Sequence, residues 1–547
     1  MAVARALLRS SVVLAVVAAS GCTGDDDRRT APPATPAPTT SAAPTTPTVT
    51  TPASPSPTPT SSPSPTSTAT PTPKPSADPS TTRASMRRYY TQRLKWTDCD
   101  GGFECTRVLV PLDYDQPAGR QIRIATIRLR ASDRDRRIGS LVINPGGPGG
   151  SGVGYARYAR QVLPRAVRQR FDVVGFDPRG VGESEPVRCL PGRRIDRWLA
   201  ADPSPDNAKE IAALVAVNKE FARGCQQRSA RLLPHVGTRD AARDMDILRA
   251  ALGDKKLTYM GKSYGTVLGA TYAELFPANV RALLLDGAVD PSIDARELAR
   301  AQAVGFERAL AAFLRYCAKD TSCAFRGDGR LGERYDALMA RIERRPLPTS
   351  LGDRMLGPGE AVVGVIAPLY DRRTGWLALG LGLAEAERGD GTTLLRLFDG
   401  YVERRSGASY GNLMEANYAV NCVDRPATEG LAALSDDARR FTQQAPRFGA
   451  LLAYGGLACA YWPVPPVDRP GPIAARGAPP IVVIGTTRDP ATPVRWSEAL
   501  ADQLESGVLL VYDGDGHTVY GNGVDCVDDA GNAYLISLKV PKSGTRC

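Results

Sequence analysis

The sequence predicts an α/β fold with a mostly parallel, doubly wound sheet and a helical insertion. Short apolar segments that read as buried strands alternate with helical segments from about residue 108 to residue 286. This is the pattern of a parallel sheet with helices on both faces. The alternation stops between residues 291 and 476, where long Ala-, Leu- and Arg-rich segments replace the strands, and it returns at residue 480. We therefore expect the two sheet portions to form one domain.

The first 21 residues read as an export signal. Arg5 and Arg9 precede a short apolar stretch, residues 11–20, which ends at Gly21-Cys22. A basic start, a short apolar run and small residues at a cleavage point are typical of a signal peptide rather than a membrane span. A cysteine at this place resembles a bacterial lipobox, in which Cys22 becomes the lipidated N-terminus. We expect an exported lipoprotein whose lipid anchors it to the outer face of the cytoplasmic membrane, with extracellular release as the alternative.

Residues 22–84 are expected to form a disordered tether, and the folded part is expected to begin near Ser85. Pro, Thr, Ser and Ala dominate the tether, and large apolar side chains are almost absent. Such a segment cannot bury enough apolar surface to offset the entropy lost on folding. Residues 85–290 and 477–547 are expected to share the sheet. The insertion, residues 291–476, is expected to form a helical lid over the site, with a separate binding domain as the alternative.

Composition argues against two kinds of partner. The net charge is +11, but the arginines are scattered and no basic block alternates with aromatic residues. This is typical of a solvated basic surface, so we expect no nucleic-acid partner. The chain has two histidines and no Cys-x-x-Cys motif, so we expect no metal site, and we expect no cofactor.

Ten cysteines follow Cys22, and an even number in an exported chain favours disulfides. The short spacings of Cys99/Cys105 and Cys317/Cys323 suggest local bonds. Sequential pairing throughout is the simplest arrangement, although spacing alone leaves other pairings open. It would give Cys99–Cys105, Cys189–Cys225, Cys317–Cys323, Cys422–Cys459 and Cys526–Cys547.

The expected strands can be placed in chain order. Val108–Leu112 and Ile122–Leu129 read as two strands joined by a turn, and Ser140–Asn144 reads as a third. Phe171–Asp177 reads as a buried fourth strand that a glycine turn follows. Further strands are expected at Leu257–Met260, Arg281–Asp286, Pro480–Gly485 and Val508–Tyr512, with a helix at about 495–504 between the last two.

A glycine-rich loop, Pro145-Gly-Gly-Pro-Gly-Gly-Ser-Gly152, directly follows the third strand. Such a loop can be a dinucleotide cradle, an oxyanion hole or a plain tight turn. Pro145 and Pro148 interrupt the Gly-x-Gly-x-x-Gly pattern that a dinucleotide cradle requires. An oxyanion hole needs backbone N–H groups aimed at developing negative charge, which a glycine turn supplies. We therefore favour the oxyanion hole.

The stretch Gly261-Lys-Ser-Tyr-Gly265 carries the nucleophile in this interpretation. It fits Gly-x-Ser-x-Gly, the nucleophile elbow of α/β-hydrolases, in which a sharp strand-to-helix turn exposes a serine hydroxyl. The strand Leu257–Met260 precedes it, and a helical pattern from Thr266 to Phe276 follows it. The alternative is a serine in an ordinary glycine turn. Such a turn does not require a strand before it and a helix after it, whereas a nucleophile elbow requires both. We therefore assign Ser263 as the nucleophile.

A serine nucleophile needs a base, and His517 is the candidate. It lies in Asp513-Gly-Asp-Gly-His517, directly after the last expected strand. His235 precedes the serine without a strand before it, so we interpret it as a surface or core histidine. Asp489 follows the penultimate strand and completes the order Ser, acid, His of α/β-hydrolases. Asp513 and Asp515 are alternative acids, but they are so close to His517 that they more naturally shape its turn.

Two N–H groups are expected to form the oxyanion hole. One belongs to Tyr264, the residue after the nucleophile, and the other to Gly147 of the glycine-rich loop. We favour Gly147 because it has an N–H group beside Pro148.

The sequence resembles the secreted bacterial tripeptidyl aminopeptidases, α/β-hydrolase serine exopeptidases related to proline iminopeptidases. The match runs from about Tyr89 to the end of the chain. Asn144-Pro145 stands where the iminopeptidases have His-Gly, which favours the tripeptidyl branch. The matching motifs are Trp96–Cys99, Glu104-Cys105, Val110–Tyr114, Asn144–Gly152, Asp177–Ser184, Gly261–Gly265, Cys422–Asp424, Asp489–Pro493, Gly514–His517, Cys526–Asp528 and Gly544–Cys547.

This resemblance implies removal of short peptides from free N-termini, sequential disulfides and a helical lid that limits how much substrate enters. It also implies that acidic residues hold the α-ammonium group of the substrate. Asp424, beside Cys422, is the candidate by position. The alternative is a carboxylate that packs in the lid and pairs with Arg425 or another arginine.

We therefore expect an exported serine exopeptidase that releases short peptides, tripeptides in the first place, from peptide substrates through an acyl-enzyme. The second hypothesis is a cell-envelope esterase, or a lipid- or peptidoglycan-modifying hydrolase, with the same triad. The third is a non-catalytic binding lipoprotein, which the complete set of Ser263, Asp489 and His517 disfavours. Dehalogenases and epoxide hydrolases need an aspartate where Ser263 stands.

Overall fold

The computed structural model describes residues 79–547 except residue 328. The expected signal peptide, Cys22 and most of the expected tether lie outside the described residues. Helix α1 (Pro79–Tyr90) begins inside the segment expected to be a tether. Proline is favoured in the first turn of a helix, since its missing N–H group would have no helical partner there.

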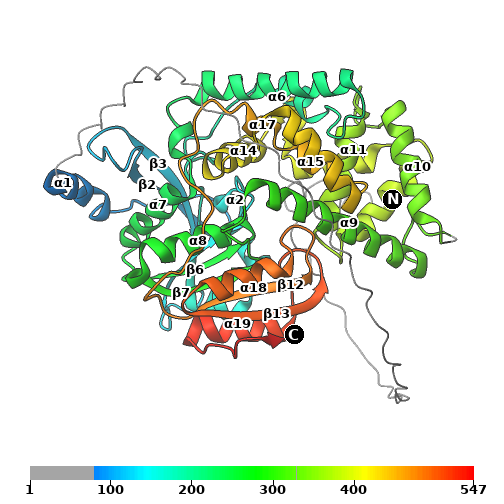
Figure 1. The fold of residues 1–547 in the computed structure, drawn as a ribbon. Helices are drawn as coiled ribbons and strands as arrows, with labels where there is room; N and C mark the ends of the chain where they lie inside the picture. The colour runs from blue at the N-terminus through cyan, green and yellow to red at the C-terminus, as the bar shows by residue number, and fades with distance from the viewer. Residues whose placement is uncertain (1–78, 328) are drawn as a thin grey trace, which may run out of the picture. The chain divides into compact units, whose positions relative to one another are not determined.

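A ten-stranded sheet organises the described residues, in the order β1-β2-β3-β5-β4-β6-β7-β12-β13-β14 (Figure 1). The strands from β5 to β14 pair in parallel, whereas β1, β2, β3 and β5 pair antiparallel. This confirms the expected mostly parallel sheet. Their bounds are β1 Thr97–Asp98, β2 Phe103–Pro111, β3 Gln121–Leu129, β4 Gly139–Asn144, β5 Phe171–Phe176, β6 Leu257–Lys262, β7 Val280–Asp286, β12 Ile481–Arg488, β13 Gly507–Asp515 and β14 Thr545–Arg546.

Helices cover both faces of the sheet, because successive side chains of a strand point to opposite faces. On β4, Val142 packs into one hydrophobic cluster, while Leu141 and Ile143 pack into another on the opposite face. All six residues of β4, β5 and β6 are buried. The first face is covered by α1, α7 (Thr238–Ala251), α8 (Tyr264–Leu275) and α18 (Val494–Gln503), and the second by α2 (Gly152–Ala156), α3 (Ala159–Val162), α4 (Arg165–Arg170) and α19 (Asp525–Ser537).

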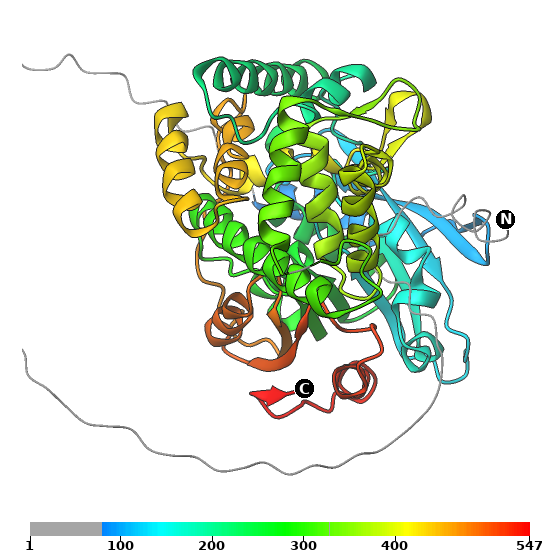
Figure 2. The ribbon, with the colours of Figure 1, turned by 90° about the vertical axis from the view of Figure 1, so that its right-hand side faces the viewer.

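The insertion between β7 and β12 is helical, with a hydrophobic cluster of its own. Figures 1 and 2 show these helices, green to yellow, gathered at one end of the strands. Between Thr374 and Tyr401 the chain forms two helices, with Gly389 (φ 94°) between them. The helices are α9 Ala295–Lys319, α10 Leu331–Arg344, α11 Pro358–Leu369, α12 Gly375–Glu387, α13 Thr392–Tyr401, α14 Leu413–Asp424, α15 Gly430–Gln444, α16 Gly449–Tyr454 and α17 Leu457–Ala460.

A second segment joins the insertion in this layer. Helices α5 (Gly192–Leu199) and α6 (Ala208–Ser229) come before the elbow in the chain. Trp198 of α5 stacks on Phe221 of α6 with ring centroids 4.0 Å apart, and both meet the edge of Tyr418 on α14. The helical layer is thus built from residues on both sides of β6.

Five disulfides join the ten cysteines in the sequential pattern: Cys99–Cys105, Cys189–Cys225, Cys317–Cys323, Cys422–Cys459 and Cys526–Cys547. Two of them are local, and the other three join residues at least 21 positions apart. Among the described residues, every helix is too short or too polar to cross a membrane.

Candidate active site

Ser263 occupies a strained turn between β6 and α8. Its backbone has φ 56° and ψ −128°, a conformation that residues with a side chain rarely adopt. Its N–H donates to the backbone oxygen of Asp286 at the end of β7 (2.9 Å), and its backbone oxygen accepts from the Thr266 N–H (2.8 Å). Neighbouring elements therefore hold the turn in place.

The two glycines of the elbow are required by close backbone contacts. A Cβ added to Gly261 would lie 2.3 Å from the oxygen of Gly265, and one added to Gly265 would lie 2.9 Å from Oδ1 of Asn144. Any side chain at either position would push helix α8 away from the strands. The motif is thus an elbow between a strand and a helix, and an ordinary glycine turn does not describe it.

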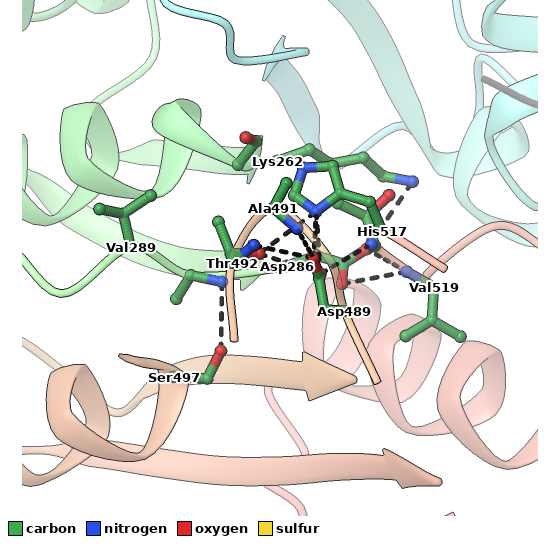
Figure 3. A network of polar contacts seen from close by, with 12 residues as sticks. Lys262, Asp286, Val289, Asp489, Ala491, Thr492, Ser497, His517 and Val519 are labelled. Atoms are coloured by element: carbon green, nitrogen blue, oxygen red, sulfur yellow. Dashed lines mark hydrogen bonds and ion pairs between the residues drawn. The ribbon is translucent and has the colours of Figure 1, made fainter. Parts of the chain in front are cut away.

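His517 and Asp489 lie on loops that follow β13 and β12 and form a close pair (Figure 3). Nδ1 of His517 is 2.9 Å from Oδ1 and 2.8 Å from Oδ2 of Asp489. The Asp489 side chain is fully buried and that of His517 is 9% exposed. Because an ionised carboxylate only accepts hydrogen bonds, Nδ1 carries the proton and Nε2 keeps its lone pair.

Four further donors fix the Asp489 carboxylate, among them the Thr518 N–H, which donates to Oδ2 (3.5 Å). Oδ1 accepts from the N–H groups of Ala491 (2.9 Å) and Thr492 (2.8 Å), and Oδ2 accepts from the Thr492 hydroxyl (2.9 Å). Oγ1 of Thr492 also lies 3.2 Å from Nδ1 of His517. The sequence analysis missed Thr492, although it belongs to the motif Asp489–Pro493 and an Asp followed by Thr three positions on is a common turn.

Ser263 and His517 lie at the same edge of the sheet. Asp286 accepts the Ser263 N–H, and a Cβ added to the next residue, Gly287, would be 3.3 Å from Cε1 of His517. Nε2 of His517 is buried, and it has no hydrogen-bond partner among residues 79–547 except 328. Its lone pair is available to a serine hydroxyl on this edge, a contact that often tightens only when substrate is bound.

The glycine-rich loop lies against the elbow. A Cβ added to Gly146 would be 2.8 Å from Cβ of Ser263 and 3.0 Å from N of Tyr264. Gly147 follows with φ 115°, and within the described part of the chain its N–H has no hydrogen-bond partner. The N–H groups of Gly147 and Tyr264 thus lie on adjoining segments beside Ser263, the arrangement that the expected oxyanion hole requires.

The insertion contacts each of these catalytic loops. Asn417 on α14 donates to the oxygen of Pro148 (2.9 Å), beside Gly147. The oxygen of Tyr370, at the end of α11, accepts the His517 N–H (2.9 Å), and the Tyr370 ring meets the imidazole edge-on at 5.3 Å. Gly305 on α9 packs against Pro490, where an added Cβ would be 2.2 Å from the backbone oxygen.

Asp424 is the last residue of α14. Its Oδ1 accepts the Thr238 N–H (2.9 Å), its Oδ2 accepts the Thr238 hydroxyl, and that hydroxyl contacts the Tyr264 hydroxyl (2.5 Å). Burial raises the pKa of Asp424 to about 6, against the opposing effect of Thr238 and Arg425. Among the described residues Asp424 forms no ion pair with an arginine, while the charge of Arg425 still acts on it and opposes the rise of its pKa.

The remaining candidates have structural contacts. Asp513 pairs with Arg488 (2.7 Å) and accepts from Thr487 (2.8 Å), and Asp515 pairs with the same arginine (2.8 Å). These two aspartates hold the loop that leads to His517. The backbone oxygen of His235 accepts from Arg179 (2.9 Å).

Comparison with known proteins places the chain in a family. Residues 139–345 match the family model described as alpha/beta hydrolase fold, and residues 444–547 match the one described as TAP-like protein. "Serine protease Hip1" of Mycobacterium tuberculosis (strain H37Rv) is 42% identical over 485 residues, which are 83% of this chain and 91% of that protein.

Two other relatives carry different names. "Carboxylesterase B" of Mycobacterium tuberculosis (strain H37Rv) is 36% identical over 456 residues, which are 81% of this chain and 86% of that protein. "Tripeptidyl aminopeptidase" of Streptomyces lividans is 32% identical over 472 residues, which are 83% of this chain and 86% of that protein. Each of these matches covers more than four fifths of this chain. The chain is a serine hydrolase, and it belongs to the tripeptidyl aminopeptidase family of α/β-hydrolase serine peptidases.

Proposed function

We propose that this protein is a serine exopeptidase that releases short peptides, tripeptides in the first place, from free N-termini. The observation that carries the proposal is the pairing of His517 with Asp489 through Nδ1, with Nε2 buried and free at the edge that holds Ser263. A relative named "Tripeptidyl aminopeptidase" supports the substrate class.

The proposed reaction has two halves. Ser263 Oγ attacks the scissile carbonyl while Nε2 of His517 takes its proton, and Asp489 stabilises the imidazolium. The N–H groups of Gly147 and Tyr264 hold the oxyanion, and His517 then protonates the leaving amine. Water, deprotonated by His517, releases the peptide from the Ser263 ester.

Asp424 is proposed to bind the α-ammonium group of the substrate. Three carboxylates, Asp424, Asp290 and Asp468, act on the single guanidinium of Arg425. The surplus negative charge favours a substrate cation there. The Thr238 hydroxyl links Asp424 to Tyr264, the residue after the nucleophile. An ammonium group bound at Asp424 would therefore be held at a fixed place relative to the elbow.

The test uses two chromogenic tripeptides that differ in one group, a free or an acetylated N-terminus. Cleavage of the free peptide alone is expected. Ser263→Ala should lower kcat by about three orders of magnitude or more, because the nucleophile is removed while the fold remains. Equal cleavage of both peptides would contradict the exopeptidase, and unchanged turnover by Ser263→Ala would contradict the mechanism.

A second candidate function is that of an esterase. A relative named "Carboxylesterase B" is 36% identical to this chain, and the same catalytic groups serve esters and amides. Testing a simple aryl ester beside the two tripeptides distinguishes the esterase from the exopeptidase. Hydrolysis of the ester with neither peptide cut would favour the esterase.

We also propose that the protein is exported and anchored through a lipid on Cys22. The five disulfides of the structure are typical of an oxidising compartment outside the cytoplasm. When cells that express the protein are fed labelled palmitate, the wild-type protein should become labelled. The Cys22→Ser variant should carry no label. Equal labelling of both would contradict the anchor, and activity in the medium would favour extracellular release.

A further inference from the structure

A buried ion pair lies next to Ser263, the proposed nucleophile. Lys262 ends β6 and Asp286 ends β7, and the two residues are partners in the parallel ladder. Their side chains are 7% and 0% exposed, and Nζ of Lys262 is 3.7 Å from Oδ2 of Asp286. Taking two charges out of water is costly, and an apolar pair of similar volume would usually stabilise the fold as well. A buried pair at this position therefore calls for a reason besides stability.

The pair holds the loop that carries the base. The Asp286 carboxylate accepts the N–H groups of Val519 (2.9 Å) and Tyr520 (2.9 Å), and the Lys262 ammonium donates to the oxygen of Tyr520 (2.7 Å). Val519 comes two residues after His517. Figure 3 shows Lys262, Asp286 and Val519 beside the His517–Asp489 pair. One backbone segment is thus fixed from both members of the ion pair.

Asp286 also acts on the elbow and the imidazole. Its backbone oxygen accepts the Ser263 N–H (2.9 Å). Burial raises the pKa of its carboxyl, and Lys262, the two N–H donors and His517 counter that rise. Asp286 and Asp489 lie at the ends of the adjacent strands β7 and β12, and a Cβ added to Gly287, next to Asp286, would be 3.3 Å from Cε1 of His517. An unbalanced Asp286 would favour the protonated imidazole, which cannot serve as a base.

Lys262 itself is not suited to be the base. Its ammonium is engaged by Tyr520 and Asp286. Burial alone would lower its pKa, but Tyr155, Asp286 and Asp528 together outweigh burial and raise it. The lysine is therefore a fixed positive charge at neutral pH.

We propose that Lys262 is a positioning residue that balances the charge of Asp286, leaving the Asp489 carboxylate to act on His517, and that keeps the His517 loop seated beside the nucleophile. This rests on the proposed roles of Ser263 and His517. The other ionisable groups packed around the cluster are Tyr155 of α2, Tyr520, Asp528 of α19, Tyr370 of the insertion, and Asp515 with its partners Arg488 and Arg372.

The test is a charge-balance cycle on the full chain, read from the pH dependence of kcat/KM for p-nitrophenyl acetate. Lys262→Met leaves Asp286 unbalanced, so the acid limb should move up by about one pH unit. Asp286→Asn leaves Lys262 unbalanced, so the limb should move down by a similar amount. The double variant Lys262→Met/Asp286→Asn should bring the limb back close to that of the wild type.

Two controls separate this role from folding. Arg249→Met removes the cation of another buried pair, with Asp246 on α7, and should lower stability with the limb unmoved. Lys262→Arg keeps the positive charge, so the acid limb of its pH profile should stay at the pH of the wild type. Labelling with a fluorophosphonate counts the folded sites of each variant.

An acid limb that stays in place in both single variants would overturn the proposal, and so would a double variant whose limb stays displaced. Failure of the proposed function itself is distinct, because it would appear as unchanged ester turnover in Ser263→Ala.

Discussion

At the scale of single residues, the site depends on carboxylates whose surroundings give them different tasks. Asp489 accepts hydrogen bonds from five groups: the N–H groups of Ala491, Thr492 and Thr518, the Thr492 hydroxyl and Nδ1 of His517, which fill the roughly four lone-pair sites of a carboxylate. It is therefore fully committed to orienting the imidazole. Asp424 accepts two bonds from Thr238, so it retains free lone pairs for a substrate cation.

Asp424 gives a prediction on pH. Its pKa is raised to about 6 by burial, so the carboxylate is charged above that pH and protonated below it. Binding of an α-ammonium group should weaken, and KM for a free tripeptide should rise, as the pH falls through about 6. Asp424→Asn should lower kcat/KM for the free peptide about tenfold to a hundredfold, because a charge-assisted hydrogen bond is lost, and should leave an aryl ester unaffected.

Asp468→Asn is the matched control. Asp468 adds to the raised pKa of Asp424 by repulsion, so its removal should keep the preference for a free N-terminus and move the rise of KM to lower pH. If Asp424→Asn still discriminates between free and acetylated peptides, the ammonium site is elsewhere.

At the scale of secondary-structure elements, the insertion does more than cover the site. Helix α9 touches the loop of the acid through Gly305, and Gln302 on the same helix donates to the oxygen of Ala491 (3.0 Å). Ala491, two residues after Asp489, is buried in the hydrophobic cluster of the insertion. The acid loop is therefore packed between the sheet and α9.

Gly305→Ala should therefore lower kcat. The added methyl group would meet the Pro490 oxygen at 2.2 Å and shift the acid loop, and a displacement near 1 Å can cost about a hundredfold. We expect a loss of about tenfold to a hundredfold on both the aryl ester and the tripeptide. A lid that only selects substrates would change the peptide alone.

Gly364→Ala is the control for that experiment. Gly364 on α11 makes the same kind of contact inside the insertion, where an added Cβ would be 2.5 Å from the oxygen of Leu394. It should lower the melting temperature while ester turnover stays near that of the wild type. Equal losses of ester turnover in both variants would mean that α9 has no special role.

Local patterns predicted most elements, whereas contacts between distant segments could not be predicted. The strands and the elbow could be predicted because apolar runs and glycines within a few residues determine them, as at Leu257–Lys262. The pairing of Lys262 with Asp286, and of Gly305 with Pro490, depends on packing that the sequence does not display. The break at Gly389 was visible in the sequence, because Gly-Asp-Gly391 is a poor helix segment. Strands β1 and β14 have two residues each, too few to show a period.

At the scale of the whole molecule, the sheet ends in a strand held by a disulfide. The N–H of Cys547 donates to the oxygen of Val511 on β13 (2.8 Å), and Cys547 is bonded to Cys526 on α19. The edge of β13, which leads to the His517 loop, is thereby covered. An uncovered strand edge would offer free hydrogen-bonding groups to other chains.

Removing this disulfide should destabilise the protein measurably. Cys526→Ser/Cys547→Ser opens a loop of separation 21, which corresponds to a loss of about 3 kcal/mol if the bond acts on the unfolded chain. Cys99→Ser/Cys105→Ser opens a loop of separation 6 and should cost about 2 kcal/mol on the same account. Thermal unfolding under non-reducing conditions shows which variant loses more stability. A larger loss in the variant that opens the shorter loop would contradict the explanation.

The insertion separates the proposed catalytic residues along the chain, which has a consequence for synthesis. Ser263 lies before the insertion, while Asp489 and His517 lie after it. A growing chain therefore contains Ser263 before Asp489 and His517 have been made, and the helices of the insertion come between them. The three proposed catalytic residues are present together only when almost the whole chain has been synthesised.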